Sequence, residues 1–350
     1  MSVYNGKRLS IEIFGESHAP EIGVSVKGFP KFTFDETKLT EFLNRRRANG
    51  KVYSTSRIES DTPVFSGVKE NLINGAFTAK IINQNVKSSD YNELYGKPRP
   101  SHADLTTYFK DGTLDFSGGG RFSGRMTAPL CIAGGLLKQY LENNGITILS
   151  YVQKIGNVQG RSYKNGIPSI SDISRAICSD FPALSERENM LKEIEEAKKD
   201  GDSVGGIIEC VVFGMKKGVG DCLFSGLEGK ISSLLYAIPA VKGVEFGAGF
   251  DFSDMRGSQA NDGLCYKNGE VAFLSDNAGG INGGISNGEP ITMRIAFRPT
   301  PSISKEQFTV DLINKTDVKI KIKGRHDACI VPRALPCVES AVAIAIYDEL

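Results

Sequence analysis

The sequence predicts an α+β fold, a layered β-α sandwich built on antiparallel sheets. Segments in which apolar and polar residues alternate are typical of strands with one buried face, and they favour antiparallel sheets over a doubly wound parallel fold. Segments of helical period lie among them, but without the strict alternation of strand and helix found in parallel α/β folds. No low-complexity linker or internal repeat divides the 350 residues, so we expect a single domain over residues 1–350.

Six segments of alternating apolar and polar residues predict strands. They are residues 9–14, 22–26, 146–155, 207–213, 290–297 and 318–323. Successive side chains of a strand point to opposite faces, so each of these segments should bury one face against a covering layer.

Five segments have helical period. The first begins after Asp35 and ends by Gly50, and the others cover residues 126–142, 188–201, 230–238 and 337–350. Thr33 with Glu36 is a candidate capping box for the first helix, and Ser185 with Glu188 for the third. The last segment, CVESAVAIAIYDEL, is apolar nearly all round, so we expect that helix to be buried.

The charge balance limits the kinds of ligand. Lys and Arg number 42 and Asp and Glu 41, a net charge of +1, so the chain lacks the basic excess with which nucleic-acid-binding proteins neutralise phosphates. We therefore expect no nucleic-acid partner, and any anionic ligand should be small.

The sequence also indicates the compartment. Its first residues, MSVYNGKRLS, lack the apolar core of a secretory signal, and no segment approaches the roughly 18 apolar residues of a membrane span. The seven cysteines are odd in number and never form a C-x-x-C pair, which argues against a disulfide scaffold or a zinc ribbon. Several lie in apolar stretches and are expected to be buried thiols. We expect a cytoplasmic protein with no membrane partner.

Glycine is unusually frequent, at 39 residues, and clusters in 117–125, 203–206, 241–250 and 278–288. Glycine lets backbone amides approach a ligand closely or adopt a positive φ. In SGGGRFSGR, glycines stand beside Arg121, Ser123 and Arg125 directly before a helix, which suits an anion site. The same stretch suits a plain turn with Ser123 as the helix cap. It matches neither G-x-x-x-x-G-K-[ST] nor G-x-G-x-x-G, so nucleotide-binding folds of those kinds are disfavoured.

Arginines accompany these loops. The triplet Arg45, Arg46 and Arg47 at the end of a helix is compatible with a solvated run that favours the helix dipole. Other arginines lie in Gly- or Pro-rich loops, where a long cation gains little by packing: Arg99, Arg121, Arg325 and Arg333. The more specific hypothesis is that these arginines converge on one ligand that carries several negative charges.

The three histidines lie in loop sequences. His18 follows Ser17, His102 precedes Asp104 by two positions, and His326 is next to Asp327. A single histidine is often structural, but imidazole is also the usual proton donor near neutral pH, and a neighbouring carboxylate can hold its tautomer. Zinc is a competing use, although neither H-x-x-x-H nor H-E-x-x-H spacing is present.

Seven motifs lie in register along the chain. FGESHAP, RPSHADLT, GGGRFSGRMTA, VKGVEFGAGF, NAGGINGGISNG, RPTPSI and KGRHDACIVPRA occur in the order and approximate spacing found in chorismate synthases, from about residue 6 to the C-terminal helix. Each motif alone is weak, but together they are highly specific. The sequence therefore resembles the chorismate synthase family, which implies that family's β-α sandwich and a homotetramer.

The resemblance implies a lyase of the shikimate pathway. It would convert 5-enolpyruvylshikimate 3-phosphate to chorismate by 1,4-elimination of phosphate, with reduced FMN required although the net reaction is redox neutral. In this family the reduced flavin transiently gives electron density to the allylic system so that phosphate can leave. The anionic groups of substrate and flavin would account for the arginines. NADPH is a possible reductant, and because no added reductase module is recognised, we expect an external source of reduced flavin.

The same resemblance implies the site residues. His18 is similar to the histidine that protonates the departing phosphate, His102 to the one that protonates the reduced flavin near N1, and Asp327 to the base toward flavin N5. His326 has no assigned role. Flavin contacts are implied at Arg121, Phe122, Ser123, Pro239, Ala240, Gly283, Arg298, Pro299, Thr300, Pro301, Ser302 and Arg325. Contacts to substrate phosphate and carboxylates, or to NADPH, are implied at Arg45, Arg46, Arg99 and Arg125.

The sequence departs from the family pattern at four positions. Val52 stands where many members have arginine, Pro239 where many have asparagine, Arg298 replaces a common lysine, and Ala19 follows GESH where glycine is usual. The first two departures motivate a second hypothesis, a phospholigand-binding or regulatory protein of the same fold that has lost turnover. A hydrolytic metalloenzyme that uses the histidines is the third.

Overall fold

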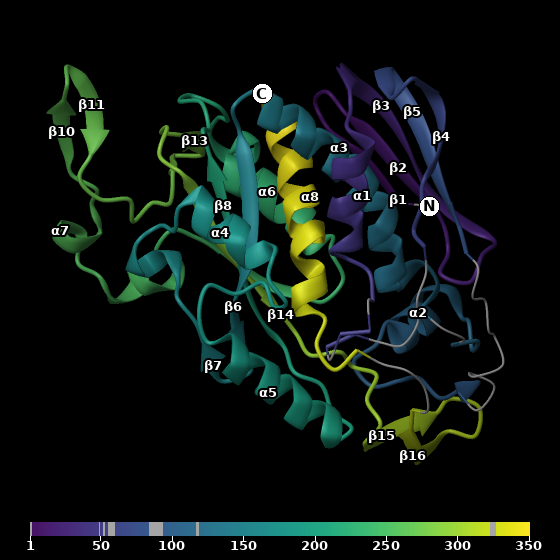
Figure 1. Cartoon of the computed structure of the whole chain (residues 1–350). Coiled ribbons are helices and arrows are strands. Elements are labelled where there is room, and N and C mark those ends of the chain that lie inside the picture. Colours follow the sequence, from purple (N-terminus) through teal and green to yellow (C-terminus); the bar gives the residue numbers. More distant parts are fainter. Residues whose placement is uncertain are drawn as a thin grey trace.

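Two five-stranded antiparallel sheets with helices between them form the body of the molecule (Figure 1). The computed structural model describes residues 2–48, 50–51, 53–54, 60–83, 94–116, 119–322 and 327–350. The predicted α+β class with antiparallel sheets is confirmed. Three residues discussed in the sequence analysis lie outside the described ranges: Val52, Arg325 and His326.

The first sheet contains the N-terminal strands. Its order is β1 (Ser2–Asn5), β2 (Ser10–Gly15), β3 (Glu21–Thr33), β5 (Leu72–Ile82) and β4 (Val64–Lys69). Along β3, the alternating residues Ile22, Val24 and Val26 have no exposed surface, which confirms the predicted one-sided burial. Strands β4 and β5 complete the sheet and were not predicted.

The second sheet collects strands from the middle and C-terminal parts of the chain. Its order is β7 (Val158–Gln159), β6 (Thr147–Ile155), β8 (Gly206–Phe213), β14 (Ile291–Phe297) and β9 (Val241–Phe246). Three of these strands match predicted segments closely, because β6, β8 and β14 carry the apolar residues of the central core.

Helices α1 (Glu36–Asn44), α3 (Thr127–Asn143), α6 (Leu227–Tyr236) and α8 (Val331–Glu349) form the layer between the sheets. Helix α3 packs on β3 and on α8, and α8 in turn packs on β6 and β8. The two helices approach so closely that a Cβ on Gly134 would lie 2.2 Å from Cβ of Ser340. Helix α8 is buried along nearly its whole length, as predicted, but it begins at Val331 and contains Pro336.

The remaining elements surround this body. The helices are α2 (Asp104–Asp111), α4 (Ile170–Ile177), α5 (Arg187–Lys199) and α7 (Gly257–Ala260), with short 3-10 turns η2 (Gly120–Phe122), η3 (Gly124–Met126), η4 (Tyr163–Asn165), η5 (Leu223–Ser225) and η6 (Gly249–Asp254). The strand pairs are β10 (Leu264–Lys267) with β11 (Glu270–Phe273), β12 (Ile281–Asn282) with β13 (Ile285–Ser286), and β15 (Glu306–Asp311) with β16 (Thr316–Lys321). In Figure 1, the β10–β11 hairpin and α7 project from one side of the body.

Two predicted capping boxes are wrong. Helix α1 is capped by Asp35, whose Oδ1 accepts from the backbone N–H of Thr37 at 2.8 Å, whereas Thr33 still belongs to β3. Helix α5 follows Glu186, which has a positive φ and makes no side-chain cap. The Ser185 hydroxyl instead accepts from the backbone N–H of Arg161 at 2.8 Å. At α1, Asp35 therefore takes the capping role that spacing had assigned to Thr33. Before α5, Ser185 bonds to Arg161 and not to the helix.

The cysteines only partly match expectation. Cys131, Cys210, Cys329 and Cys337 are buried thiols, whereas Cys178 and Cys222 are exposed. Within the described ranges, no helix combines the length and apolar character that crossing a bilayer would require.

Candidate active site

The loop after β2 carries His18. Gly15 ends the strand with φ of 86°, and a Cβ there would lie 2.4 Å from the carbonyl oxygen of Glu21, so the turn requires glycine. The backbone N–H of Ser17 donates to the carbonyl of Gly120 at 3.3 Å. The half-buried His18 is thereby placed beside the glycine-rich loop that precedes α3.

The glycine-rich loop folds as two short turns, η2 and η3. Ser123 caps η3, since its Oγ accepts from the backbone N–H of Arg125 at 3.2 Å. The guanidinium of Arg121 lies over the Phe122 ring, 5.1 Å from its centroid, and donates to Asp111 at 2.5 Å. Arg121 and Phe122 are exposed, so both can contact a ligand at this surface.

A buried carboxylate joins two of the predicted substrate arginines. Asp61 Oδ2 accepts from Nη1 of Arg46 at 2.9 Å, and its Oδ1 accepts from Nη1 of Arg125. Arg46 also donates from Nε to the Thr127 hydroxyl at 2.9 Å. Arg125 donates from Nε and Nη2 to Oδ1 of Asn83, at 3.2 and 3.0 Å.

Asp327 and Arg333 lie next to this cluster, at the start of α8. Nη1 of Arg333 donates to both carboxylate oxygens of Asp327, each at 2.7 Å. Its Nε donates to the backbone carbonyl of Arg46 at 2.9 Å. Arg333 therefore links the predicted base to the residues that follow α1.

Arg45 has a different environment. Its guanidinium makes a two-pronged ion pair with Glu339 of α8, with N–O distances of 2.9 and 2.6 Å. Burial raises the pKa of the Glu339 carboxyl, but the charges of Arg45 and Lys138 outweigh this and keep the pKa below its ordinary value. The structure thus shows Arg45 joining α1 to α8, and its contact with a substrate stays a prediction.

The second histidine belongs to a buried charge cluster. Nδ1 of His102 lies 2.7 Å from Oδ1 of Asp104, the first residue of α2. The Arg99 guanidinium donates to both oxygens of the same carboxylate, at 2.7 and 2.8 Å. Burial alone would raise the pKa of Asp104, but hydrogen bonds from Arg99 and His102 lower it to about 2. Asp104 is therefore ionised at neutral pH and orients both neighbours.

The segment 298–302 contacts the loop that carries His102. Nη1 of Arg298 donates to the carbonyl of Ser101 at 2.6 Å, and its backbone N–H donates to the carbonyl of Ala240 at 3.0 Å. Ala240 adopts a positive φ of 75°, a conformation that non-glycine residues rarely hold. The Thr300 carbonyl accepts from the Ser203 hydroxyl at 2.7 Å. Pro239, Ala240 and 298–302 thus form one surface beside His102.

Comparison with known proteins identifies this arrangement. The family model described as chorismate synthase matches residues 9–350. The chain belongs to the chorismate synthase family. It is therefore an enzyme, a carbon–oxygen lyase acting on phosphates, and the resemblance seen in its seven motifs is confirmed.

Individual relatives agree with the family match. The chain is 44% identical over 349 residues to a chorismate synthase of Thermococcus kodakarensis, covering 99% of this chain and 96% of that one. It is 40% identical over 357 residues to one of Dehalococcoides mccartyi, with the same coverage of 99% and 96%. A crystal structure of chorismate synthase superposes with a TM-score of 0.78 at 26% identity, covering 99% of this chain and 92% of that one.

Hydrogen bonds connect the residues that the chorismate synthase motifs singled out. The His18 loop reaches Asn83, whose Nδ2 donates to the Ala19 carbonyl at 2.7 Å, and from Asn83 the contacts continue through Arg125, Asp61, Arg46 and Arg333 to Asp327. The His102 cluster joins at two places. Arg121 contacts Asp111 at the far end of α2, and the backbone N–H of Val204, next to Ser203, donates to the Ala328 carbonyl at 2.9 Å.

Gly283 lies apart from these contacts, in the turn between β12 and β13. Its φ is 62°, and no atom lies within 4 Å of the position that a Cβ would take. The turn is held from the other side, where the carbonyl of Gly284 accepts from the backbone N–H of Leu227 at 3.0 Å. Space next to Gly283 is therefore open for a close approach of another group.

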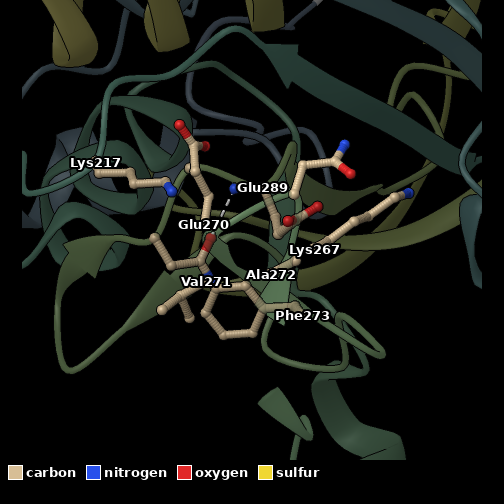
Figure 2. Close-up of a pocket in the computed structure, with 10 residues that line it drawn as sticks. Lys217, Lys267, Glu270, Val271, Ala272, Phe273 and Glu289 are labelled. Carbon is tan, nitrogen blue, oxygen red and sulfur yellow. Dashed lines mark hydrogen bonds between the residues drawn. The ribbon is translucent and has the colours of Figure 1, made fainter. Parts of the chain in front are cut away.

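A pocket lies along β11 and the turn of the β10–β11 hairpin. Figure 2 shows Lys217, Lys267, Glu270 and Glu289 around it, with Val271 and Phe273 nearby. Its volume is about 480 Å³. Asn287 and Gly288, the last residues of the motif NAGGINGGISNG, line it, but none of the site residues named from the resemblance does.

Three residues of the site were not found from the sequence: Asp61, Asn83 and Thr127. Each stands outside the seven motifs or at the edge of one, and each contacts an arginine far away in the chain. Asn83 directly follows the last residue of β5. A polar residue at the end of a strand is the sequence signal that could have pointed to it as a site residue.

Proposed function

We propose that this chain converts 5-enolpyruvylshikimate 3-phosphate to chorismate by 1,4-elimination of phosphate, with reduced FMN as cofactor. The observation that carries the proposal is the hydrogen-bonded path from the His18 loop through Arg125, Asp61 and Arg46 to Asp327, in a chain of the chorismate synthase family. A proton donor, guanidinium groups and a carboxylate base are what this elimination requires of a protein.

The segments assigned to the flavin fit a ligand rich in hydrogen-bond acceptors. Nε of Arg298 and the hydroxyl of Thr300 are buried and have no hydrogen-bond partner within the described residues. Buried donors of this kind normally find a partner, so a bound group with phosphate or carbonyl oxygens would satisfy them. Arg121, Phe122 and Ser123 would hold one side of FMN, and Pro239, Ala240, Gly283, Arg325 and residues 298–302 the other. When bound, reduced FMN supplies transient electron density to the allylic system of the substrate.

His18 would give a proton to the departing phosphate. Its loop is fixed by Asn83 and by the contact of Ser17 with Gly120, so the imidazole can be presented in one orientation. The Ser17 hydroxyl is buried without a hydrogen-bond partner in the described part of the chain, which leaves it able to donate to a substrate oxygen. Protonation makes phosphate a better leaving group.

His102 would hold a proton close to flavin N1. Arg99 can only donate hydrogen bonds, and the shorter contact of His102 Nδ1 is to Asp104, so the network assigns the Nδ1 proton to that bond. Nε2 is then the atom that exchanges a proton with a ligand.

Asp327 would accept a proton on a carboxylate oxygen toward flavin N5. Arg333 donates to both of its oxygens and so orients the carboxylate. Arg45, Arg46, Arg99 and Arg125 are assigned to the substrate anions or to NADPH. Their carboxylate partners Glu339, Asp61 and Asp104 preorganise these guanidinium groups before any ligand arrives.

We further propose a single domain over residues 1–350, a cytoplasmic location and a homotetramer. One hydrophobic cluster contains residues from Leu9 to Tyr347, which supports a single domain. Leu223, Phe224, Phe250, Tyr266 and Leu274 are highly exposed apolar side chains on η5, η6 and the β10–β11 region, which supports a covering partner copy. Light scattering of the purified protein measures the assembly, and a monomer at micromolar concentration would contradict it.

The test of the reaction is an anaerobic assay with reduced FMN. Adding the substrate should release one phosphate per chorismate formed, with a transient change in the flavin spectrum. Absence of phosphate release would overturn the proposal. Tight binding of both ligands without turnover would instead support the second hypothesis, a binding protein of the same fold, which the departures Val52 and Pro239 motivate.

The reductant is tested in the same assay. If the chain relies on an external supply of reduced FMN, NADPH with oxidised FMN should give no chorismate. Chemically reduced FMN should give chorismate. The metalloenzyme hypothesis gains no support: the described residues contain no group of three or more His, Cys, Asp or Glu side chains placed to hold a metal ion.

A further inference from the structure

Asp61 is a buried carboxylate between two arginines of the candidate site. Only 4% of the residue is exposed, and each of its oxygens accepts a hydrogen bond from a different guanidinium, Oδ2 from Arg46 and Oδ1 from Arg125. Asp61 is not among the site residues implied by the motifs. The proposed function uses it only as a partner of the substrate arginines and leaves open how it acts on the His18 loop.

The backbone at Asp61 is strained. Its φ of 45° lies in the left-handed region, which costs conformational energy for any residue with a Cβ. The residue has this conformation shortly before β4 begins, and its carboxylate accepts two charged hydrogen bonds there. A strained, buried and charged residue beside a site is a candidate for a role in that site.

On one side, Asp61 orients Arg46. That guanidinium also donates from Nη2 to the carbonyl of Gly124 at 2.8 Å and from Nε to Thr127, whose own hydroxyl donates to Gly124 at 2.6 Å. Arg46 is thus bound both to Asp61 and to the glycine-rich loop. The loop and the carboxylate together define its position.

On the other side, Asp61 orients Arg125, and through it the histidine loop. Arg125 donates twice to Oδ1 of Asn83, and Nδ2 of Asn83 donates to the Ala19 carbonyl, one residue after His18. The backbone N–H of Asn83 donates to the Pro20 carbonyl at 2.9 Å. A displacement of Arg125 is therefore transmitted to the segment that carries His18.

We propose that Asp61 is a positioning residue of this site: it fixes Arg125 and Arg46 relative to the His18 loop and removes one positive charge from the pair. The inference rests on the proposed function for its effect on turnover. Its effect on anion binding does not require turnover, because a net charge that rises by one strengthens the binding of any anion nearby.

The test is Asp61→Asn, which keeps the size of the side chain and tolerates a positive φ. We expect inorganic phosphate to bind about tenfold more tightly, from the added net charge at an effective dielectric constant of about 20. We expect kcat to fall about 10- to 100-fold, because displaced catalytic groups react slowly, with no rise in KM. A merely structural role would lower the folded fraction and leave phosphate affinity unchanged, and that result would overturn the proposal.

Phosphate affinity is measured from the rise of the melting temperature with phosphate concentration, in the presence of saturating oxidised FMN. This readout is independent of turnover. If the wild-type chain released no phosphate from the substrate, the proposed function would fail while the phosphate measurement still decided the charge effect of Asp61. Unchanged phosphate affinity in Asp61→Asn overturns the inference in either case.

A double variant, Asp61→Asn with Asn83→Asp, separates charge from position. It restores the negative charge next to Arg125 but removes the amide that donates to Ala19. Phosphate affinity should return to the wild-type value while kcat stays low. Recovery of kcat as well would show that charge alone matters and would overturn the positioning role.

Two further variants complete the design. If Asp61→Asn does not fold, Asn83→Ala removes the contacts between Arg125 and the His18 loop without changing any charge. This variant should lower kcat and leave the phosphate affinity unchanged. A wild-type kcat would overturn the inference. The matched control is Asp348→Asn, a buried carboxylate remote from the site at the end of α8. It should leave kcat, KM and phosphate affinity unchanged even though the fold is destabilised.

Discussion

Nδ1 of His102 lies 2.7 Å from Oδ1 of Asp104, a carboxylate that also accepts two hydrogen bonds from the Arg99 guanidinium. The two residues are separated by one position in the chain, and the first turn of α2 brings them together. One ionised group thus sets the tautomer of the histidine and the orientation of the arginine. Both consequences can be tested separately.

Removing the imidazole tests the proton transfer. His102→Ala should lower kcat by roughly 100- to 10,000-fold, the range for general acid–base groups, with little change in the melting temperature. Single-turnover kinetics with reduced FMN measure the rate. A rate equal to that of the wild type would remove His102 from the mechanism.

Acid titration tests the carboxylate. The pKa of Asp104 is about 2 instead of its ordinary 3.8, so its ionised form contributes about 2 kcal/mol of stability. Because the folded-state pKa is the lower one, this contribution is present above about pH 4 and disappears as the pH falls toward 2. The stability difference between the wild type and Asp104→Asn should therefore shrink over that range in urea titrations. A difference independent of pH would show that Asp104 titrates normally.

His18 should act on the leaving group and not on flavin binding. His18→Ala is expected to slow phosphate release by roughly 100- to 10,000-fold while the affinity for FMN stays at the wild-type value. Phosphate release and flavin fluorescence measure the two quantities. Equal losses in both would assign His18 to cofactor binding.

Gly283 tests the assigned flavin surface. Gly283→Ala places a methyl group in open space but at a φ of 62°, so it should cost about 1 kcal/mol of stability. If FMN approaches the backbone at this turn, its affinity should also fall, by about tenfold. Gly145→Ala is the matched control, because Gly145 also has a positive φ and open space but lies at the end of α3. The same FMN affinity in both variants would place the flavin elsewhere.

The ends of the chain are joined through Asp348. Its carboxylate accepts from the backbone N–H groups of Lys7, Arg8 and Leu9 at 2.8 to 3.0 Å, and from the Tyr4 hydroxyl at 2.9 Å. Asp348→Asn should destabilise the fold by about 1–3 kcal/mol, because buried donors lose their partner. Thermal unfolding measures the loss. An unchanged melting temperature would mean that water replaces the carboxylate without cost.

The alternating pattern located β2, β3, β6, β8, β14 and β16, but it did not predict how all of them are buried. The one-sided burial expected for β6 and β8 is wrong, because both strands are buried at consecutive positions, and α4, α5 and α8 all pack on β6. Strand β5 does bury alternate residues, Phe77, Ala79 and Ile81, yet it was not predicted. Strand β4, VFSGVK, is an edge strand with mostly exposed residues, so it carries no such pattern. The start of α8 was placed too late because Pro332 and Pro336 suggest an interruption, whereas Pro332 lies in the first helical turn and the helix accommodates Pro336.

The site was predictable where its residues belong to motifs. His18, His102 and Arg121 could be recognised from their sequence neighbours. Asp61 and Asn83 could not, because their arginine partner is 64 and 42 positions away and neither residue has a local pattern. Contacts of that kind are set by the packing of α3 against the first sheet, which no short stretch of sequence encodes.

The position of α8 in chain order bears on how the protein is made. Every strand of both sheets precedes α8, yet the helix packs between them. While the chain emerges from the ribosome, the apolar surface of β6 and β8 that α8 covers in the folded protein is therefore still without that helix. Nascent chains in this state are exposed to aggregation, and release of the segment from Val331 onward is the step that ends it.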